Sequence, residues 1–344
     1  MKQLLNTLFV VSEDTWLSLE DNNIVVHRED GSKSRCPLLN IENILYFGWK
    51  GASPALLGYC AERDIGFCFL NPLGKFLARV CGESRGNVLL RKEQYRLSDD
   101  EDASCRISQC MIIGKICNAR LTLMRAQREH PHSIQREKEF AEAVATLKAS
   151  IGDAQHAATM DELRGVEGNA ARAYFSVFED MILANKISFQ MIGRTKRPPR
   201  DPMNALLSFL YTLLAHDCAS ALESVGLDSY VGFLHRDRPG RNSLALDLME
   251  ELRSPFADRL ALAIVNNRSI TAKHFRTLEN GAVLLNSDGK KILLTQWQEK
   301  KRDKITHPFL KEKIVWGIVP YIQALLLAKY VRKDLDGYPA FIWK

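Results

Sequence analysis

The stretch IGFCFLNPLGKFLARVCG, residues 65–82, decides the fold that we expect for this chain. Its two apolar runs, residues 65–70 and 76–80, flank the segment 71–75, whose proline and glycine are typical of a hairpin turn. Beyond Gly82 the strand-like pattern stops, and apolar residues recur with a helical period. The sequence therefore predicts strands before this point and helices after it.

The residues before this hairpin predict a mostly β domain with one helix. Further strand-like runs, rich in apolar and β-branched residues, cover residues 7–11, 16–20, 24–27 and 41–46. Asp21-Asn22-Asn23 predicts a second hairpin turn. The one predicted helix covers residues 54–63, with Pro54 in its first turn. We assign this domain to residues 1–82.

The residues after the hairpin predict a larger, mostly α-helical domain, residues 83–344. Its predicted helices cover residues 107–128, 133–150, 161–187, 203–225, 243–253, 255–267 and 311–332. Gly152 is expected to end the second of these helices, and residues 203–225 are apolar enough to be buried. One late hairpin is expected around Asp288-Gly289, between residues 283–285 and 292–294. The expected fold class is α+β.

The composition is that of a globular protein. The 344 residues are 46% hydrophobic and 26% charged, so a sizeable core is expected. The formal net charge of +6 permits a polyanionic partner without requiring one. The sequence lacks a phosphate loop of the GxxxxGK[ST] or GxGxxG type, which excludes the usual nucleotide-binding folds.

The cysteines and the apolar runs indicate the compartment. Eight cysteines occur without a CxxC pair, so we expect free thiols in a reducing cytoplasm rather than a cysteine zinc site. The N-terminus develops no signal-peptide core, and no run of about 18 apolar residues occurs. We expect a soluble, cytoplasmic protein without a membrane span.

A carboxylate interrupts the apolar stripe of one predicted helix. Glu167, Ala170, Ala171, Tyr174 and Phe178 recur at helical spacing and share one face. A carboxylate on a core-facing stripe is costly unless a metal ion or a cation accompanies it, or its pKa rises. A purely structural pair with an arginine explains the position equally well.

A histidine and an acidic helix follow further along the chain. His235 lies between an apolar stretch and a basic loop, where a structural role and a ligand role are both open. In the predicted helix 243–253, Asp247, Glu250 and Glu251 stand at i, i+3 and i+4, so their carboxylates share one face. Such a face is either solvated or neutralised by a cation.

Glu167, His235 and Glu250 together form an oxygen-rich set with one imidazole. This set suits Mg²⁺ or Mn²⁺ better than zinc. Such a site polarises a phosphoryl oxygen and orients a hydroxyl nucleophile. Basic residues lie near these positions in the sequence: Arg194, Lys196, Arg197, Arg200, Arg236, Arg238, Arg241, Lys300, Lys301, Arg302 and Lys304. Each cluster alone is typical of a solvated surface, but beside a metal site they fit a DNA-backbone footprint.

Four segments, in this order along the chain, resemble one family. They are EGNAARAYF (167–175), RPPRDPMNALLS (197–208), GFLH (232–235) and SLALDLMEELR (243–253). The sequence is similar to CRISPR-associated protein one, the integrase subunit of CRISPR adaptation, and the β-then-α order matches over essentially the whole chain. The opening residues 6–10 and the wording of the motifs resemble most the subfamily found with type I-C systems.

The resemblance implies a definite site and definite partners. The metal ligands of the family fall on Glu167, His235 and Glu250, and Asp247 aligns with an acidic position that supports the site in some relatives. The family forms homodimers through the β domains, and two dimers clamp a dimer of CRISPR-associated protein two in a heterohexamer. The complex holds double-stranded DNA and inserts its 3′ ends into the CRISPR array by 3′-hydroxyl attack on repeat phosphodiesters. The same site acts on branched DNA.

Two other functions fit the residues, and one segment has two interpretations. The chain is alternatively a stand-alone structure-specific DNA nuclease, or a non-catalytic DNA-binding scaffold in which the acidic cluster is structural. The C-terminal residues 336–344 are unusually apolar for a tail. They are expected to dock either on their own domain or on a partner subunit.

Overall fold

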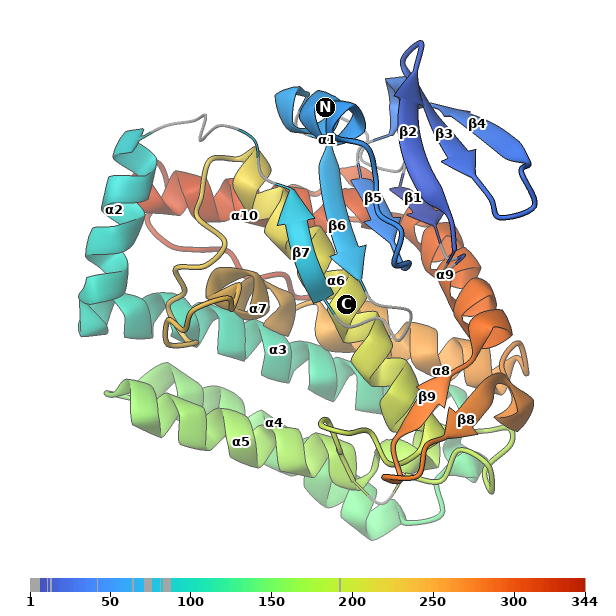
Figure 1. Cartoon of the computed structure of the whole chain (residues 1–344). Helices are drawn as coiled ribbons and strands as arrows, with labels where there is room; N and C mark the ends of the chain where they lie inside the picture. The colour runs from blue at the N-terminus through green and yellow to red at the C-terminus, as the bar shows by residue number, and fades with distance from the viewer. Residues whose placement is uncertain are drawn as a thin grey trace.

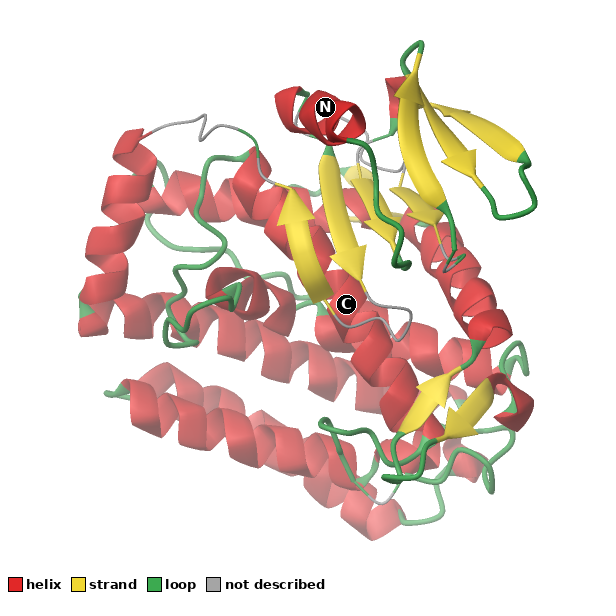
Figure 2. Ribbon diagram, in the orientation of Figure 1, coloured by secondary structure: helices red, strands yellow, loops and turns green. Residues whose placement is uncertain are grey.

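The chain folds as strands followed by helices, as the computed structural model in Figure 1 shows. The structure describes residues 7–10, 12, 14–41, 43–63, 65–70, 76–80, 82, 88–191 and 193–343. The predicted hairpin turn at 71–75 and the junction at 83–87 lie outside the described residues. Figure 2 shows the strands gathered mainly at one end of the molecule and the long helices beside them. This arrangement confirms the predicted α+β fold class.

The N-terminal strands form two sheets. The parallel strands β1 (Thr7–Val10), β5 (Asn43–Tyr46) and β6 (Gly66–Leu70) continue into antiparallel β7 (Phe76–Val80). The second sheet is antiparallel and contains β2 (Trp16–Glu20), β3 (Asn23–His27) and β4 (Lys33–Pro37). The strand β4 is an addition to the predicted set.

Two local signals in this region are confirmed. Glu20 pairs with Asn23, which leaves Asp21 and Asn22 as a two-residue loop with φ of 48° and 60°. Asp and Asn tolerate this left-handed backbone, which matches the twist of a hairpin. The helix α1 (Pro54–Glu62) begins after Ser53, whose side chain accepts a hydrogen bond from the Leu56 amide.

The helical part is built around its two longest helices, residues 101–129 and 202–224. Its helices are α2 (Val88–Asp99), α3 (Glu101–Glu129), α4 (Glu137–His156), α5 (Met160–Ser176), α6 (Pro202–Ser224), α7 (Ser243–Glu250), α8 (Arg259–Asn266), α9 (Ser287–Arg302) and α10 (Val319–Val331). Helix α3 packs against α4 and α5 on one side and against α7 on another (Figure 1). Two short hairpins, β8 (Phe275–Thr277) with β9 (Val283–Leu285) and β10 (Lys304–Thr306) with β11 (Lys313–Val315), complete this part.

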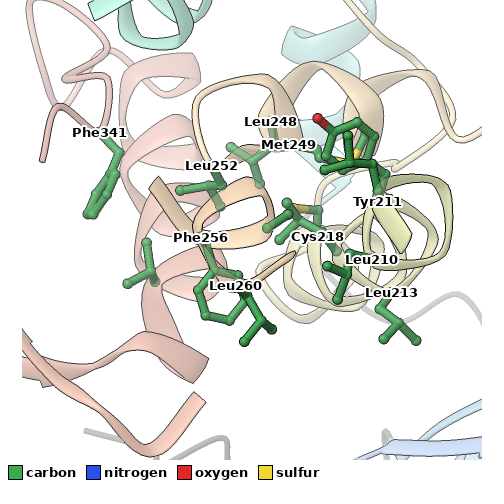
Figure 3. Close-up of a cluster of buried hydrophobic side chains, with 14 of the residues drawn as sticks. Leu210, Tyr211, Leu213, Cys218, Leu248, Met249, Leu252, Phe256, Leu260 and Phe341 are labelled. Atoms are coloured by element: carbon green, nitrogen blue, oxygen red, sulfur yellow. The ribbon is translucent and has the colours of Figure 1, made fainter. Parts of the chain in front are cut away.

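Helix α6 is the centre of the core. It is long and apolar enough to cross a membrane by composition, but it packs against α7 and α10 inside the protein, as predicted for residues 203–225. Figure 3 shows its Leu210 and Cys218 facing Leu248 and Phe256, which lie on α7 and the turns after it. Burial of such side chains stabilises the fold by roughly 1.5–3 kcal/mol each. This core holds the elements that carry the acidic helix in place.

Several helix boundaries differ from the prediction. Helix α4 runs through Gly152 to His156, because one glycine weakens a helix without breaking it. Helix α5 ends at Ser176 and is followed by a 3₁₀ turn, Phe178–Met181, instead of reaching residue 187. The helix predicted to begin at residue 255 begins at Arg259, since Pro255 lies in a π-helical segment, Arg253–Asp258, that leads into α8.

The predicted late hairpin and the last helix are also corrected. Strand β9 pairs with β8, and residues 292–294 lie inside α9 instead of forming a strand. Asn286 caps α9 by accepting a hydrogen bond from the Gly289 amide, so the polar segment begins a helix where a turn was expected. The last helix begins at Val319, after β11, and not at residue 311.

The C-terminal tail packs on its own chain. Tyr338 and Phe341 are buried, and Phe341 belongs to the main hydrophobic core. Asn118 of α3 donates to the Phe341 carbonyl at 2.6 Å and accepts from the Trp343 amide at 3.0 Å. The first of the two expected dockings is therefore the one that the structure shows.

Candidate active site

Glu167 lies on the inner stripe of α5, as its spacing predicts. The helix begins with a capping box, in which Glu162 and Thr159 satisfy each other's backbone amides. Leu163, Ala170 and Tyr174 of the stripe are buried, and the Glu167 side chain between them is 29% exposed. Its Oε1 contacts the ammonium of Lys115, which comes from α3. The charge partner expected for this carboxylate is therefore present, as a lysine instead of an arginine.

Glu250 approaches the same lysine from α7. Its Oε2 lies 2.8 Å from Lys115 Nζ, and its Oε1 lies 2.8 Å from Arg253 Nη2. Burial raises the pKa of Glu250, but the charges of Arg253, Lys115 and His235 outweigh it and hold that pKa well below its usual range. Glu250 is thus a buried carboxylate whose charged form is favoured by its neighbours. The structure brings Glu167 and Glu250, predicted from distant segments, around one cation.

Asp247 organises the loop that carries His235. Its Oδ2 accepts hydrogen bonds from the amides of Phe233 and Leu234 at 2.7 and 3.0 Å. Its Oδ1 accepts from the His235 amide at 3.0 Å and lies 2.6 Å from Nδ1 of the same residue. Because a carboxylate is an acceptor, this contact places a proton on Nδ1 and leaves Nε2 as the free ligand atom.

A second contact joins the histidine loop to α5. Arg164 Nη2 donates to the Leu234 carbonyl at 2.9 Å, while its Nη1 bonds Asp161 at 2.8 Å. Arg164 lies one turn before Glu167 on the same helix. The loop of His235 and the helix of Glu167 are therefore tied together next to the two carboxylates.

The acidic face of α7 is buried, so its interpretation as a solvated face is wrong. Asp247, Glu250 and Glu251 are all nearly inaccessible, and each has its own hydrogen-bond or ion-pair partners. Glu251 accepts from the Tyr338 hydroxyl, from Gln323 Nε2 at 2.9 Å and from the Phe341 amide at 2.7 Å. Burial raises the pKa of Glu251 to about 7, against the lowering effect of these donors. Glu251 thus binds the C-terminal tail, whereas Glu250 contacts the cations of the candidate site.

A cavity of about 490 Å³ opens beside the carboxylates. Lys115, Glu167, Arg194, Lys196, Tyr211 and Arg253 are among its lining residues. Asp258, which also lines the cavity, accepts from the Tyr174 hydroxyl at 3.0 Å and from the Tyr211 hydroxyl at 2.6 Å. Burial raises the pKa of Asp258 to about 6, although both hydrogen bonds lower it. The lining therefore combines a cationic wall, formed by Lys115, Arg194, Lys196 and Arg253, with the hydrogen-bonded cluster of Asp258 and the two tyrosines.

The side chains fit a hard divalent cation. Glu167 and Glu250 supply carboxylates and His235 an imidazole, which is a donor set for Mg²⁺ or Mn²⁺. The buried Oε2 of Glu250 accepts no hydrogen bond of normal geometry from the described residues, although the Lys115 ammonium lies 2.8 Å away. Over the same residues, no three His, Cys, Asp or Glu side chains form a ready-made metal cluster. In the structure both carboxylates contact a protein cation, the Lys115 ammonium.

The predicted basic residues between residues 194 and 200 divide into two groups. Arg194 points inward, where it donates to Asn204 Oδ1 at 2.7 Å and to Ser208 Oγ at 3.1 Å. Arg200 donates to the Asn280 carbonyl at 2.9 Å and is otherwise exposed. Lys196 and Arg197 are exposed, and Lys196 also lines the cavity. The exposed members can reach a phosphate backbone, whereas Arg194 is committed to α6.

The basic loop after His235 is more open. Arg236 and Arg238 are exposed. Arg241 is half-buried, and it donates to the Arg236 carbonyl and to Ser243 Oγ at 3.2 Å. Arg241 therefore shapes the loop, and Arg236 and Arg238 remain accessible on it. In the third cluster, Lys301 is buried against Asp217 at 2.9 Å and serves the fold.

Sequence reasoning missed two charged residues of the site. Lys115 lies in the apolar run Met111-Ile112-Ile113-Gly114-Lys115-Ile116, and a lysine there raises the same question as Glu167 on its stripe. That signal could have found it. Arg253 follows Glu250 at i+3 on the predicted helix and is a helix-spacing partner in retrospect. Its place inside the cavity wall depends on the π-helical segment, which the sequence does not reveal.

Two sequence comparisons show the family of the chain. Residues 8–299 match the family model described as CRISPR associated protein Cas1. A relative from Chlorobaculum tepidum, the CRISPR-associated endonuclease Cas1 1, is 46% identical over 344 residues, which cover 100% of both chains.

Two solved structures share the fold. A casposase bound to integration product has a TM-score of 0.86 and 20% sequence identity, covering 98% of this chain and 94% of that chain. The Cas6-RT-Cas1–Cas2 complex has a TM-score of 0.81 and 22% identity, covering 100% of this chain and 36% of that chain. At these identities the likeness concerns the fold.

Proposed function

Because the chain belongs to the CRISPR-associated protein Cas1 family, we propose that it is a metal-dependent DNA endonuclease and integrase of CRISPR adaptation. It inserts spacer DNA into the CRISPR array. The observation that carries this proposal is the meeting of Glu167 and Glu250, from α5 and α7, around a single cation beside the His235 loop. The relative from Chlorobaculum tepidum is named an endonuclease, and the match to it covers its full length.

Glu167, His235 and Glu250 would hold Mg²⁺ or Mn²⁺. When bound, the ion supplies Lewis acidity toward a phosphoryl oxygen and a template for the attacking hydroxyl. The surrounding charges keep the pKa of Glu250 low, so its carboxylate is available as an anion. His235 presents Nε2, because its Nδ1 is bonded to Asp247. Both Asp247 oxygens are occupied by three backbone amides and one imidazole. We therefore assign Asp247 the role of orienting His235 instead of binding the ion directly.

The reaction is a transesterification. The 3′-oxygen of the spacer strand attacks a repeat phosphorus, the bond from that phosphorus to its former 3′-oxygen breaks, and the proton passes to the departing oxygen. One phosphodiester is formed for each one lost, so no energy-rich cofactor is required. The same chemistry with water as nucleophile gives endonuclease cleavage. The reverse of the joining reaction resolves branched DNA.

Exposed cations supply a path for the DNA backbone. Arg236 and Arg238 lie on the His235 loop, and Lys196 and Arg197 lie beside the cavity. Phosphate contacts from such residues position a duplex without reading its sequence. We place Arg200 at the edge of this surface, and Arg194 and Arg241 in supporting roles behind it, since their guanidinium groups bind the protein itself.

The N-terminal region is proposed as the dimerisation domain, residues 1–82, and residues 83–344 as the catalytic domain. Large apolar side chains are exposed on the former: Leu39 is 90% exposed and Trp49 is 64% exposed, with Trp16 also accessible. Exposed aromatic and aliphatic groups of this size are typical of interfaces. A dimer of CRISPR-associated protein two is the proposed second partner, in a heterohexamer with two dimers of this chain. A solved complex of the same fold contains Cas1 and Cas2 together.

Two finer assignments belong to the proposal. The type I-C subfamily is supported by the opening residues 6–10 and by the wording of the four motifs. The genes beside its own would test this subtype. A cytoplasmic location is supported by the cysteines that the structure describes, which are all free thiols, as in reducing compartments.

A strand-transfer assay tests the proposed function. Purified protein, its small partner, a short DNA duplex and a plasmid with a repeat array are combined with Mg²⁺ or Mn²⁺. Glu167→Ala, His235→Ala and Glu250→Ala should each abolish integration while circular dichroism shows a folded protein, because each removes one ligand of the ion. Integration by the wild type at full rate in the presence of a chelator would contradict the proposal. Full turnover by one of the three variants would remove that residue from the ligand set.

A further inference from the structure

Lys115 lies where three helices of the site meet. It belongs to α3, which packs against α5 and α7, and its side chain is only 14% exposed. Its ammonium contacts Oε1 of Glu167 and lies 2.8 Å from Oε2 of Glu250. A lysine so enclosed between two carboxylates from different helices is not a surface cation. It acts on the site as a bound positive ion.

The two cations around Glu250 have different positions. Arg253 bonds Oε1 of Glu250, and its guanidinium also lies over the Tyr211 ring, 4.9 Å from the ring centre. Lys115 takes the other oxygen, Oε2, on the side that Glu167 shares. Arg253 therefore anchors Glu250 from outside the carboxylate pair, and Lys115 stands between its members.

We propose that Lys115 is the resident cation of the metal-free site, and that a divalent ion binds only by displacing its ammonium. This inference rests on the proposed function, since it concerns the same ligand set. The ammonium contacts the oxygens that the ion needs, and two cations sharing one carboxylate pair repel each other. Metal binding is accordingly an exchange of one cation for another.

The structure offers the displaced side chain a destination. Lys115 lines the cavity of about 490 Å³, and its four-carbon stem is flexible enough to turn into that space. There it joins Lys196 on the cationic wall. The exchange therefore moves positive charge from the carboxylates toward the side on which DNA phosphates would lie.

Calorimetric titration of Mn²⁺ into the full-length protein tests the exchange. Lys115→Met removes the competing ammonium and leaves two carboxylates that favour a cation. Its Kd for Mn²⁺ should fall by about tenfold or more, equivalent to about 1.4 kcal/mol. Lys115→Arg keeps a cation between the carboxylates, so it should bind Mn²⁺ no more tightly than wild type does. The matched control Lys196→Met removes a lysine from the same cavity without a carboxylate contact, so its effect should also stay within about threefold.

The outcomes separate this inference from the metal site itself. If wild type binds Mn²⁺, Glu167→Gln loses it, and Lys115→Met binds no tighter than wild type, the exchange is wrong and the metal site stands. If neither wild type nor Lys115→Met binds Mn²⁺, the metal site itself is wrong. If a thermal melt shows that Lys115→Met does not fold, Lys115→Gln replaces it. Glutamine keeps a hydrogen-bond donor near the carboxylates but carries no charge. An unchanged Mn²⁺ affinity of Lys115→Gln would overturn the exchange.

Discussion

Asp247 is the residue that holds the loop of His235 in place. Its two oxygens hold the backbone amides of Phe233, Leu234 and His235 and the ring of His235. Buried acceptors in such numbers fix a loop, because each lost partner leaves an unsatisfied donor. The direction in which His235 points is therefore set by Asp247 on α7, the same helix that carries Glu250.

We predict that Asp247→Asn damages the metal site and the fold together. An amide keeps the size of the side chain but replaces one acceptor oxygen by a donor, which faces amide donors. The free energy of unfolding should fall by about 1–3 kcal/mol. Mn²⁺ affinity should fall by about 10–100-fold, as for other outer ligand partners. Denaturation and calorimetry measure the two effects, and unchanged Mn²⁺ affinity in a folded variant would remove Asp247 from the support of His235.

A second residue-scale prediction concerns Asp258. Burial raises its pKa from 3.8 to about 6. The folded protein therefore binds this proton more tightly than the unfolded chain does, so the stabilising effect is complete below pH 3.8. It is lost as the pH rises through about 6. Between pH 4 and pH 7, wild type should lose on the order of 3 kcal/mol relative to Asp258→Asn, which carries no titrating group there.

Chemical denaturation of both proteins across this range measures the difference. Contributions of other titrating groups cancel in the comparison of wild type with Asp258→Asn. A constant difference from pH 4 to pH 7 would show that Asp258 keeps an ordinary pKa in the folded protein.

At the same scale, the sequence was informative only for charges that break a pattern. Glu167 could be predicted because it interrupts a helical stripe, and its position on the buried stripe of α5 is confirmed. Lys115 gives the same signal in an apolar run but needs a partner from another helix, which one sequence does not reveal. The burial of Asp247 depends on three amides of a loop, and no periodicity predicts a loop's path.

Among the elements, α7 connects the site to the end of the chain. Glu250 faces Lys115 on one side, and the next residue, Glu251, accepts from Tyr338 and Phe341 of the tail on the other. Asn118 of α3 donates to the carbonyls of both Glu251 and Phe341, at 2.7 and 2.6 Å. The tail therefore fixes α7 against α3, and these are the helices that carry Glu250 and Lys115.

We predict that the tail contributes to stability through this contact. Tyr338→Phe keeps the buried ring and removes the hydroxyl that donates to Glu251. The free energy of unfolding should fall by about 1–3 kcal/mol, the cost of a buried acceptor that loses its donor. Urea denaturation measures it. Tyr321→Phe is a matched control on α10, and a loss of equal size there would show that the contact with Glu251 has no special weight.

The elements themselves could be predicted where local chemistry is decisive. The hairpin at Asp21-Asn22 and the start of α1 at Pro54 are confirmed, since positive φ and a capped first turn are local requirements. The late hairpin failed because apolar runs of three residues have no distinct period, and the Asn286 cap was not recognised. The π-helical segment before α8 was not predicted, because the α-helical period of the sequence gives no signal for it.

For the whole molecule, the proposed dimer contact involves the exposed apolar residues of the N-terminal region. Leu39 and Trp49 are among the most exposed large apolar side chains of the described residues. We predict that the protein is a dimer and that Trp49→Glu shifts it toward monomer, because a charge placed in an apolar interface is desolvated without a partner. Sedimentation velocity measures the change.

The control for this measurement is Ile187→Glu. Ile187 is 96% exposed but lies in the loop after α5, away from the N-terminal region. It should leave the dimer intact. Equal dissociation by both variants would show that the N-terminal face has no particular part in the dimer.

The central claim is that Glu167, His235 and Glu250 together hold one divalent ion. A crystal of the full chain grown with Mn²⁺, measured at the manganese absorption edge, tests it most directly. We predict one anomalous peak bound by both carboxylates and by Nε2 of His235, at distances of about 2.0–2.3 Å. A crystal saturated with Mn²⁺ that shows no peak there, with Lys115 still between the carboxylates, would contradict the account.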